Sequence, residues 1–301
     1  MSNERRLCLS LGIALAVMAA EALGGYLSGS LALLSDAGHM LTDAFALGLS
    51  LLALRIALRP PHGRATFGYQ RVGLLVAVVN GLGLLAIALF IFREAYQRLQ
   101  SPPEIQTALM LSVASAGLVA NLAMAFILGR GHEDLNIRSA WLHVFGDTLS
   151  SLGVVVSALV IAATGWRSID PLMSFLIGAI ILVGGLRVVA EALEIFLQLT
   201  PRGIDPEELA RTLCQIPGVQ GVHDLHVWAH TRGRVFFSAH VWVADQSLSA
   251  LEALRARIKE RLRKMGIEHA TLEFECAECA TEGLYCQLEP YPQEGPEHHR
   301  H

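Results

Sequence analysis

Charged side chains are scarce in this sequence, and lysine is almost missing. Only 17% of the 301 residues are Asp, Glu, Lys or Arg, and only two of the 23 basic residues are lysines. The net charge of −4 gives no basic footprint for a nucleic-acid partner. A hydrophobic share of 53% and a positive mean hydropathy are too high for an ordinary water-soluble domain, so we expect a lipid-facing surface.

Cysteine is sparse as well, with five residues in the chain. Cys8 and Cys214 stand alone among apolar neighbours, whereas Cys276, Cys279 and Cys286 lie in a region that we predict to be cytoplasmic and reducing. This distribution argues against a disulfide framework. The sequence also lacks a Gly-x-x-x-x-Gly-Lys-Ser/Thr phosphate loop, so nothing in it indicates use of ATP.

The charges that do occur are unevenly spread along the chain. Residues 201–301 hold 11 of the 23 Lys and Arg residues and 15 of the 27 Asp and Glu residues. This shift predicts two domains in different solvents, a transmembrane domain over 1–200 and a cytoplasmic domain over 201–280, for which metal binding and dimerisation are considered below. Residues 281–301 are interpreted as a solvated tail that ends in several histidines.

Long apolar runs define the first domain. A hydrocarbon core about 30 Å thick needs about 20 apolar residues in a helix, because backbone groups in lipid must bond within their own segment. Six segments qualify, so the predicted fold class is a polytopic α-helical membrane protein with six transmembrane helices. They cover approximately 8–27, 32–54, 72–92, 107–129, 139–164 and 171–196.

Arginine placement predicts the orientation, because basic residues near span ends stay on the cytoplasmic side. They flank the amino terminus, the connections between spans two and three and between spans four and five, and the exit of span six. Both termini are therefore expected to be cytoplasmic. The short loops and the preference for arginine over lysine favour a bacterial plasma membrane.

Two of the predicted spans carry ionisable groups in their interior, where such groups are functional candidates. Span two contains His39 and Asp43, and span five contains His143 and Asp147. Residues four apart share one face of a helix, so two opposed faces would present two imidazoles and two carboxylates. Zn²⁺ accepts a tetrahedral set of this kind, with Cd²⁺, Co²⁺ or Ni²⁺ as further candidates, whereas Mg²⁺ and Ca²⁺ prefer oxygen shells of higher number.

The same residues have a structural interpretation, in which each pair is a hydrogen bond or an ion pair between spans. The recurrence of one spacing in two spans favours metal ligands. Asp36 lies three residues before His39 and is interpreted either as lining an entry path or as a helix cap. For Glu21 in span one, we expect a packing role through interhelical hydrogen bonds.

After Pro201 the hydrophobic period changes. The order of elements expected there is helix, strand, strand, helix, strand, which indicates a small ferredoxin-like α+β domain. His223, His240, His269 and Glu275 fall on its strands or at their ends and are candidate metal ligands. A lone histidine on a strand is more often a hydrogen-bonded structural residue. Cys276 and Cys279 have the spacing of a zinc or redox pair, with two unpaired surface thiols as the alternative.

Three separated motifs resemble the signatures of the cation diffusion facilitator family. They are SLALLSDAGHMLTD at 30–43, FGYQR at 67–71 and AWLHVFGD at 140–147. The resemblance implies a homodimeric antiporter that exchanges cytoplasmic Zn²⁺ for protons by alternating access, with His39, Asp43, His143 and Asp147 as its transport site. It also implies regulatory zinc binding by the cytoplasmic domain.

The sequence departs from some members of that family in two loops. A loop metal site after Phe67-Gly68 is not expected, because Tyr69 follows where those members carry ligands. The histidine-rich loop between spans four and five is reduced to the short segment 132–134. Two other classes of function remain open at this point: a membrane metalloenzyme, which would need an open zinc coordination position, and a metal sensor anchored by its spans.

Overall fold

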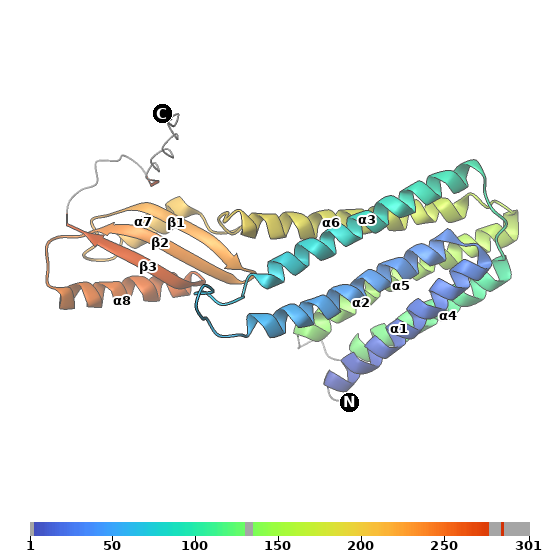
Figure 1. Cartoon of the computed structure of the whole chain (residues 1–301), viewed down its shortest axis with the longest axis horizontal. Coiled ribbons are helices and arrows are strands. Elements are labelled where there is room, and N and C mark those ends of the chain that lie inside the picture. Colours follow the sequence, from blue (N-terminus) through green and yellow to red (C-terminus); the bar gives the residue numbers. More distant parts are fainter. Residues whose placement is uncertain (1–2, 130–134, 277–283, 286–301) are drawn as a thin grey trace, which may run out of the picture. The chain divides into compact units, whose positions relative to one another are not determined.

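In the computed structural model of the chain, residues 3–129, 135–276 and 284–285 are described, without the side chains of 3–8, 128–129 and 135–143. The described chain divides into two compact units, one ending at Leu193 and the other beginning at Glu194. The first unit is helical and the second contains a sheet (Figure 1). Each unit is described by itself.

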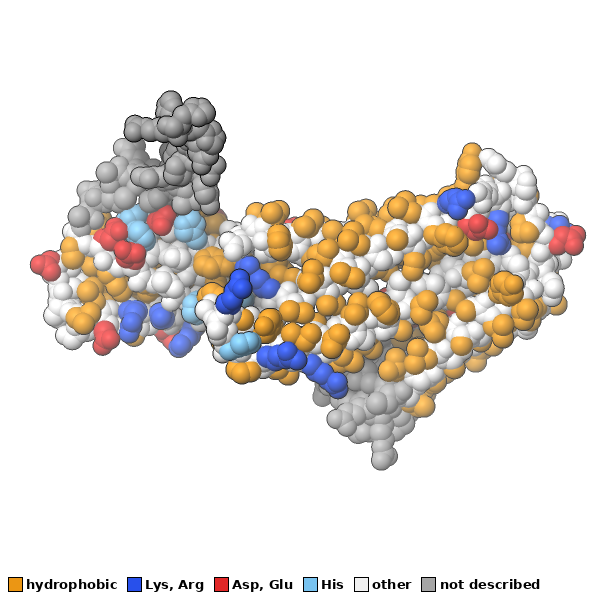
Figure 2. All heavy atoms as spheres, in the orientation of Figure 1, with side chains coloured by type: hydrophobic (Ala, Val, Ile, Leu, Met, Phe, Trp, Pro, Cys, Tyr) orange, Lys and Arg blue, Asp and Glu red, His pale blue; other side chains and the backbone are white. Residues whose placement is uncertain are grey.

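Six long helices make up the first unit, and each is long and apolar enough to cross a membrane. The prediction of six transmembrane helices is therefore confirmed. Figure 2 shows that hydrophobic side chains cover most of the visible face of these helices. The helices are α1 (Asn3–Ser28), α2 (Leu31–Ala57), α3 (Val72–Gln100), α4 (Thr107–Gly129), α5 (Leu135–Thr164) and α6 (Ile169–Phe196).

Two packing groups of helices are joined by a contact between α2 and α3. In the first group, α1 packs against α2 and α4, and α4 packs against α5. Helices α3 and α6 lie side by side (Figure 1), with glycines at their closest approach: a Cβ atom on Gly185 would lie 3.1 Å from the side chain of Leu84. One apolar cluster includes residues of α2 through α6 and joins the two groups.

The second unit has the predicted order of elements, which confirms the α+β fold class. Its elements are α7 (Pro206–Cys214), β1 (Gly221–Thr231), β2 (Arg234–Trp242), α8 (Leu248–Lys264) and β3 (Ile267–Glu275). Strand β2 is central, antiparallel to β1 and parallel to β3. Asp205 accepts a hydrogen bond from the backbone of Glu207 and caps α7, whose first residue is the proline expected there.

The core of this unit lies between the sheet and its two helices. Leu209 of α7 and Ile258 of α8 pack on Val227 and Phe237 of the strands, and all four are nearly or fully buried. Because side chains alternate along a strand, the next residues along β2, Phe236 and Ser238, belong to the opposite face. That face also carries His240. This predicted ligand therefore lies on the side of the sheet that faces away from the core.

Candidate functional sites

Helix α2 carries His39 and Asp43, and its first turn is fixed by a buried carboxylate. Ser30 caps the helix through Leu33, while Asp170 of α6 accepts hydrogen bonds from the Ser30 hydroxyl at 2.6 Å and from the Leu31 backbone at 2.8 Å. A carboxylate at a helix amino terminus satisfies backbone donors and opposes the helix dipole. Asp170 thus fixes the start of α2.

Within α2, His39 and Asp43 face each other across one helical turn, as their spacing predicts. His39 Nε2 lies 3.6 Å from an Asp43 carboxylate oxygen, and both side chains are about one-quarter exposed. Two ligands of a tetrahedral zinc ion with bonds of about 2.0 Å lie roughly 3.3 Å apart. The pair therefore needs little movement to coordinate one ion.

Asp147 lies on α5 and is 7% exposed. Asp147 of α5 and His39 of α2 are both close enough to Asp36 to act on its carboxylate electrostatically. His143 belongs to α5, but its side chain lies outside the described residues. The joint geometry of the four predicted ligands thus remains a prediction.

Asp36 connects the two ligand-bearing helices. Its carboxylate accepts hydrogen bonds from Ser150 at 2.7 Å and from Ser151 at 3.2 Å, both on α5. Asn121 of α4 donates to Ser151 at 3.0 Å and extends the network. Asp36 is 2% exposed and lies well inside α2, so its interpretation as a helix cap is wrong.

Asp36 lies three residues before His39, and Ser150 follows Asp147 at the same spacing. On both helices, the hydrogen bonds between Asp36 and the two serines, which we call the Asp36 link, therefore lie about one turn, or roughly 5 Å, from a predicted ligand. A connection this close to both pairs of predicted ligands would help to set the distance between them. Sequence reasoning missed the serines because hydroxyl residues in apolar spans are common and carry no spacing that would single them out.

Glu21 is the second interior residue for which the structure corrects an expectation. Its side chain is 1% exposed, and neither carboxyl oxygen has a hydrogen-bond partner among the described residues. The interhelical hydrogen bonds that we expected for it are absent from that part of the chain. Glu21 instead lies against Gly117 of α4, where a Cβ atom would come within 2.4 Å of Oε1, so only glycine allows this approach.

The second unit contains the only described group of three or more side chains whose ligand atoms all lie within 4.8 Å of one another. Its members are His223, His240 and Glu275. One oxygen of Glu275 lies 3.1 Å from His223 Nε2, and the other lies 2.8 Å from His240 Nδ1. Three strands contribute to this group, since β1 carries His223, β2 carries His240 and β3 ends at Glu275.

Two further carboxylates surround His240, and sequence analysis did not find them. Asp224 and Glu273 each place an oxygen 3.5 Å from His240 Nε2. Strict alternation would send His223 and Asp224 to opposite faces of the sheet. A register irregularity in β1 after His223, with a positive φ of 46° at Asp224, lets both side chains approach His240.

Three further residues of this unit were predicted as ligands: His269, Cys276 and Cys279. His269 pairs with Phe236 across β2 and β3, with ring centroids 4.6 Å apart. It precedes Glu275 by six residues, or about 20 Å of strand, so it does not join the His223 group within one chain. Cys276 is exposed directly after β3, and Cys279 lies outside the described residues.

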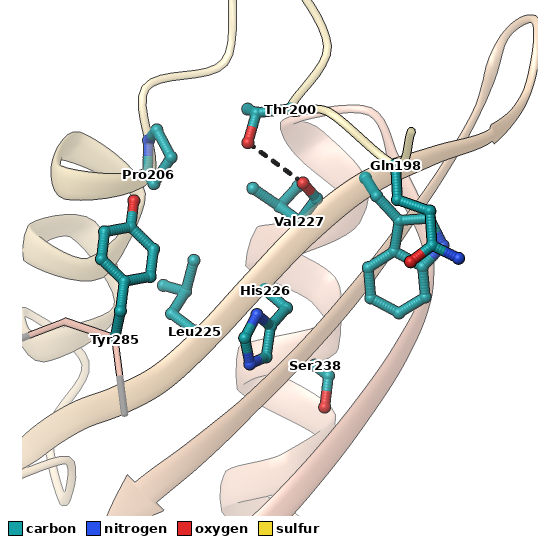
Figure 3. A pocket seen from close by; sticks show the side chains of 9 residues that line it. Gln198, Thr200, Pro206, Leu225, His226, Val227, Ser238 and Tyr285 are labelled. Carbon is teal, nitrogen blue, oxygen red and sulfur yellow. Dashed lines mark hydrogen bonds between the residues drawn. The ribbon is translucent and has the colours of Figure 1, made fainter. Parts of the chain in front are cut away.

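A separate pocket of about 440 Å³ opens beside β1 in the same unit (Figure 3). Thr200 donates a hydrogen bond to the Val227 carbonyl in its wall, and Tyr285 and Pro206 lie at one end of it. Leu284 accepts a backbone hydrogen bond from Leu225, which holds this part of the tail against the strand. His226 is the one lining residue with a metal-ligand side chain, so the pocket is distinct from the His223 group.

Six membrane-spanning helices with interior carboxylates, followed by a small α+β domain with a histidine cluster, define a transporter for metal cations. Residues 7–197 match the cation efflux transmembrane domain, and residues 201–275 match the cytoplasmic domain of cation efflux proteins. The chain belongs to this family, the cation diffusion facilitators. It is a multi-pass membrane protein and not an enzyme, and its dimer domain marks it as a homodimer.

Curated relatives match over nearly their whole length. The chain is 38% identical to the cadmium, cobalt and zinc/H⁺-K⁺ antiporter of Bacillus subtilis, over 100% of this chain and 97% of the relative. It is 40% identical to the zinc transporter ZitB of Escherichia coli, over 100% and 95%. The metal cation efflux system protein CzcD of Cupriavidus metallidurans is 39% identical, over 92% and 88%.

Proposed function

We propose that this protein exports Zn²⁺ from the cytoplasm in exchange for protons, with Cd²⁺, Co²⁺ and Ni²⁺ as further substrates. The transport site would consist of His39 and Asp43 of α2 and of His143 and Asp147 of α5. The observation that carries this proposal is the Asp36 link to Ser150 and Ser151, which connects the two ligand-bearing helices about one turn from the predicted ligands. The names of the relatives support the choice of metals.

Exchange for protons has a chemical basis in this ligand set. An imidazole binds zinc only when neutral, and a carboxylate binds best when ionised, so loading the metal expels protons. The apparent affinity for zinc should therefore fall as the pH falls. A proton gradient directed into the cytoplasm would then drive release of zinc on the opposite side by alternating access.

We also propose that the domain after α6 binds zinc as a regulator. His223, His240 and Glu275 would be the ligands, with Asp224 close enough to contribute. Zinc bound there would offset the excess of acidic side chains and favour a closed pairing of the domains of two protomers. It would shift the equilibrium between the closed and open pairings only by the difference in its affinity for the two. Cys276 and Cys279 stay predicted metal ligands of this domain. His269 also stays a predicted ligand, at a place apart from the His223 group.

We propose the following placement in the membrane: both termini face the cytoplasm of a bacterial cell, and the plasma membrane is the host. The arginine-rich connections support this orientation. The two other functional classes fare worse. The names of the relatives are those of transporters, which argues against the metalloenzyme. A sensor anchored by its spans would have no use for buried carboxylates on four transmembrane helices.

The test is uptake of metal into sealed proteoliposomes after a pH jump, measured for Zn²⁺, Cd²⁺, Co²⁺ and Mn²⁺. An outwardly directed proton gradient should accelerate zinc uptake, and a protonophore should remove that acceleration. Zinc uptake that is insensitive to the gradient would contradict proton exchange. Absence of zinc flux in any condition would contradict the transport function itself and favour the sensor.

A further inference from the structure

Glu21 and Asp36 are both buried carboxylates, but their surroundings differ. Asp36 accepts two hydrogen bonds from serine hydroxyls, whereas the two oxygens of Glu21 receive none from the described residues. Helix α4, which packs against Glu21 through Gly117, has no ionisable side chain in its sequence. Among the residues whose side chains are described, Glu21 therefore has neither the donors nor the basic partner that usually accompany a buried charge.

The charges that reach Glu21 are negative. The carboxylates of Asp36 on α2 and Asp147 on α5 both act on it, and Asp147 belongs to the proposed transport site. The one imidazole on α2, that of His39, lies 3.6 Å from an Asp43 oxygen. Helix α5 carries His143, whose side chain lies outside the described residues. Helix α1 contributes no second acidic or basic group between residues 9 and 28. Among the described residues, the charged groups that act on Glu21 are thus two carboxylates from two other helices.

An ionised carboxylate without donors in such a place costs several kcal/mol, so Glu21 needs a bound cation. The close approach of Gly117 to Oε1 leaves little room for a metal ion on that side, and a proton requires none. We propose that Glu21 is a proton-binding site coupled to the transport site, holding a proton while that site is empty and releasing it when Zn²⁺ loads. This inference rests on the proposed proton exchange.

The step balances without any further reactant. As Zn²⁺ brings two positive charges to the α2 and α5 ligands, the O–H bond of Glu21 breaks, its electron pair stays on the carboxylate, and the proton passes to water. The ionised carboxylate then offsets part of the charge of the metal. Return of a proton to Glu21 would weaken that balance and favour release of zinc. Glu21 would act through charge and not as a metal ligand.

The experiment counts protons released per zinc ion bound by the full-length protein in detergent, using a pH indicator in weakly buffered solution. Glu21→Gln keeps the shape of the protonated side chain and removes the exchangeable proton. It should release about one proton fewer per zinc than the wild type. The Glu21→Asp variant retains a carboxyl group, so the number of protons that it releases per zinc ion should be closer to that of the wild type. This variant also tests the proposal if Glu21→Gln fails to fold.

Ser157→Ala is the matched control, because Ser157 is fully buried on α5 and has no hydrogen-bond partner among the described residues. It lies ten residues beyond Asp147, or about 15 Å along the helix. Its proton release should equal that of the wild type. Folding of every variant is checked by size-exclusion chromatography.

Each outcome has a defined meaning. Proton release by the wild type with an unchanged count in Glu21→Gln would overturn the assignment of Glu21 and leave the proposed exchange intact. No proton release by the wild type would overturn the exchange itself. If zinc binding instead depends on K⁺ in the wild type and loses that dependence in Glu21→Gln, with the proton count unchanged, the site takes a metal cation and the proton assignment is wrong.

Discussion

The two candidate metal sites differ in how their ligands are held. In the membrane unit, Asp147 and Asp36 are almost fully buried, and Asp36 accepts hydrogen bonds from two serine hydroxyls of α5. In the C-terminal unit, His240 and Glu275 are each more than one-quarter exposed and contact each other directly. Water can replace a lost contact at the second site but not around the buried Asp147 and Asp36. Removing a ligand should therefore cost far more in the membrane.

The largest expected effect tests that difference directly. Asp147→Ala or Asp43→Ala removes a charge and a coordinating oxygen from the transport site. Zinc flux into proteoliposomes should fall more than about 100-fold, because even changes behind the ligands typically cost 10–100-fold in metal affinity. The dimer should stay intact on size-exclusion chromatography. Flux at the wild-type rate in either variant would remove that residue from the mechanism.

The next effect concerns the link between α2 and α5. The double substitution Ser150→Ala and Ser151→Ala leaves all four predicted ligands in place but removes both donors to Asp36. A hydrogen bond to a charged group is worth roughly 1.5–3 kcal/mol, so apparent zinc affinity should weaken by about tenfold or more. The ratio of zinc to cadmium transport should change as well.

The control for that link is Ser112→Ala, because Ser112 is an exposed residue of α4 whose hydroxyl donates a hydrogen bond to the Leu109 carbonyl of the same helix. It should leave both affinity and the metal ratio unchanged. A Ser150→Ala, Ser151→Ala variant with reduced protein yield but an unaltered zinc to cadmium ratio would show that the link stabilises the fold without setting the site.

The contrast also explains what could be predicted from the sequence. A site on helices follows one period, so the spacing of His39 and Asp43 alone predicted their contact. Hydrophobic runs likewise predicted the six helices, because lipid imposes their length. The site on strands depends on pairing between distant segments and on the irregularity at Asp224, and neither is encoded in local alternation. His269 was grouped with the other histidines for the same reason.

Buried residues outside the ligand spacing were also hard to predict. Asp170 lies at the end of an apolar span, where sequence gives no reason to expect three hydrogen bonds to the start of α2. Glu21 was expected to form hydrogen bonds because most buried polar groups do so. Only the close approach of Gly117, which depends on how α1 and α4 pack, shows why donors do not surround it.

A smaller effect concerns selectivity in the membrane site. His39→Asp replaces a nitrogen ligand with oxygen and makes the set harder, so transport of Mn²⁺ should rise relative to Zn²⁺. The measurement is competition between the two metals for uptake, and Met40→Leu is the control because Met40 is buried on α2 and its replacement keeps the hydrophobic volume similar. An unaltered metal profile in His39→Asp would mean that selectivity is set elsewhere.

The smallest effect on transport should come from the C-terminal unit, where the structure separates residues that the sequence grouped together. In the full-length protein, His240→Ala removes the histidine that contacts Glu275 and lies near Asp224 and Glu273. It should lower the number of zinc ions bound per chain by about one and weaken the response of transport to cytoplasmic zinc, while the maximal flux stays close to that of the wild type. His269→Ala should leave the zinc count unchanged, because His269 lies about 20 Å along β3 from Glu275. Loss of the same ion in both variants would mean that His269 of one protomer reaches the His223 group of its partner. An unchanged count in His240→Ala would leave the C-terminal unit as a dimerisation domain without this zinc site.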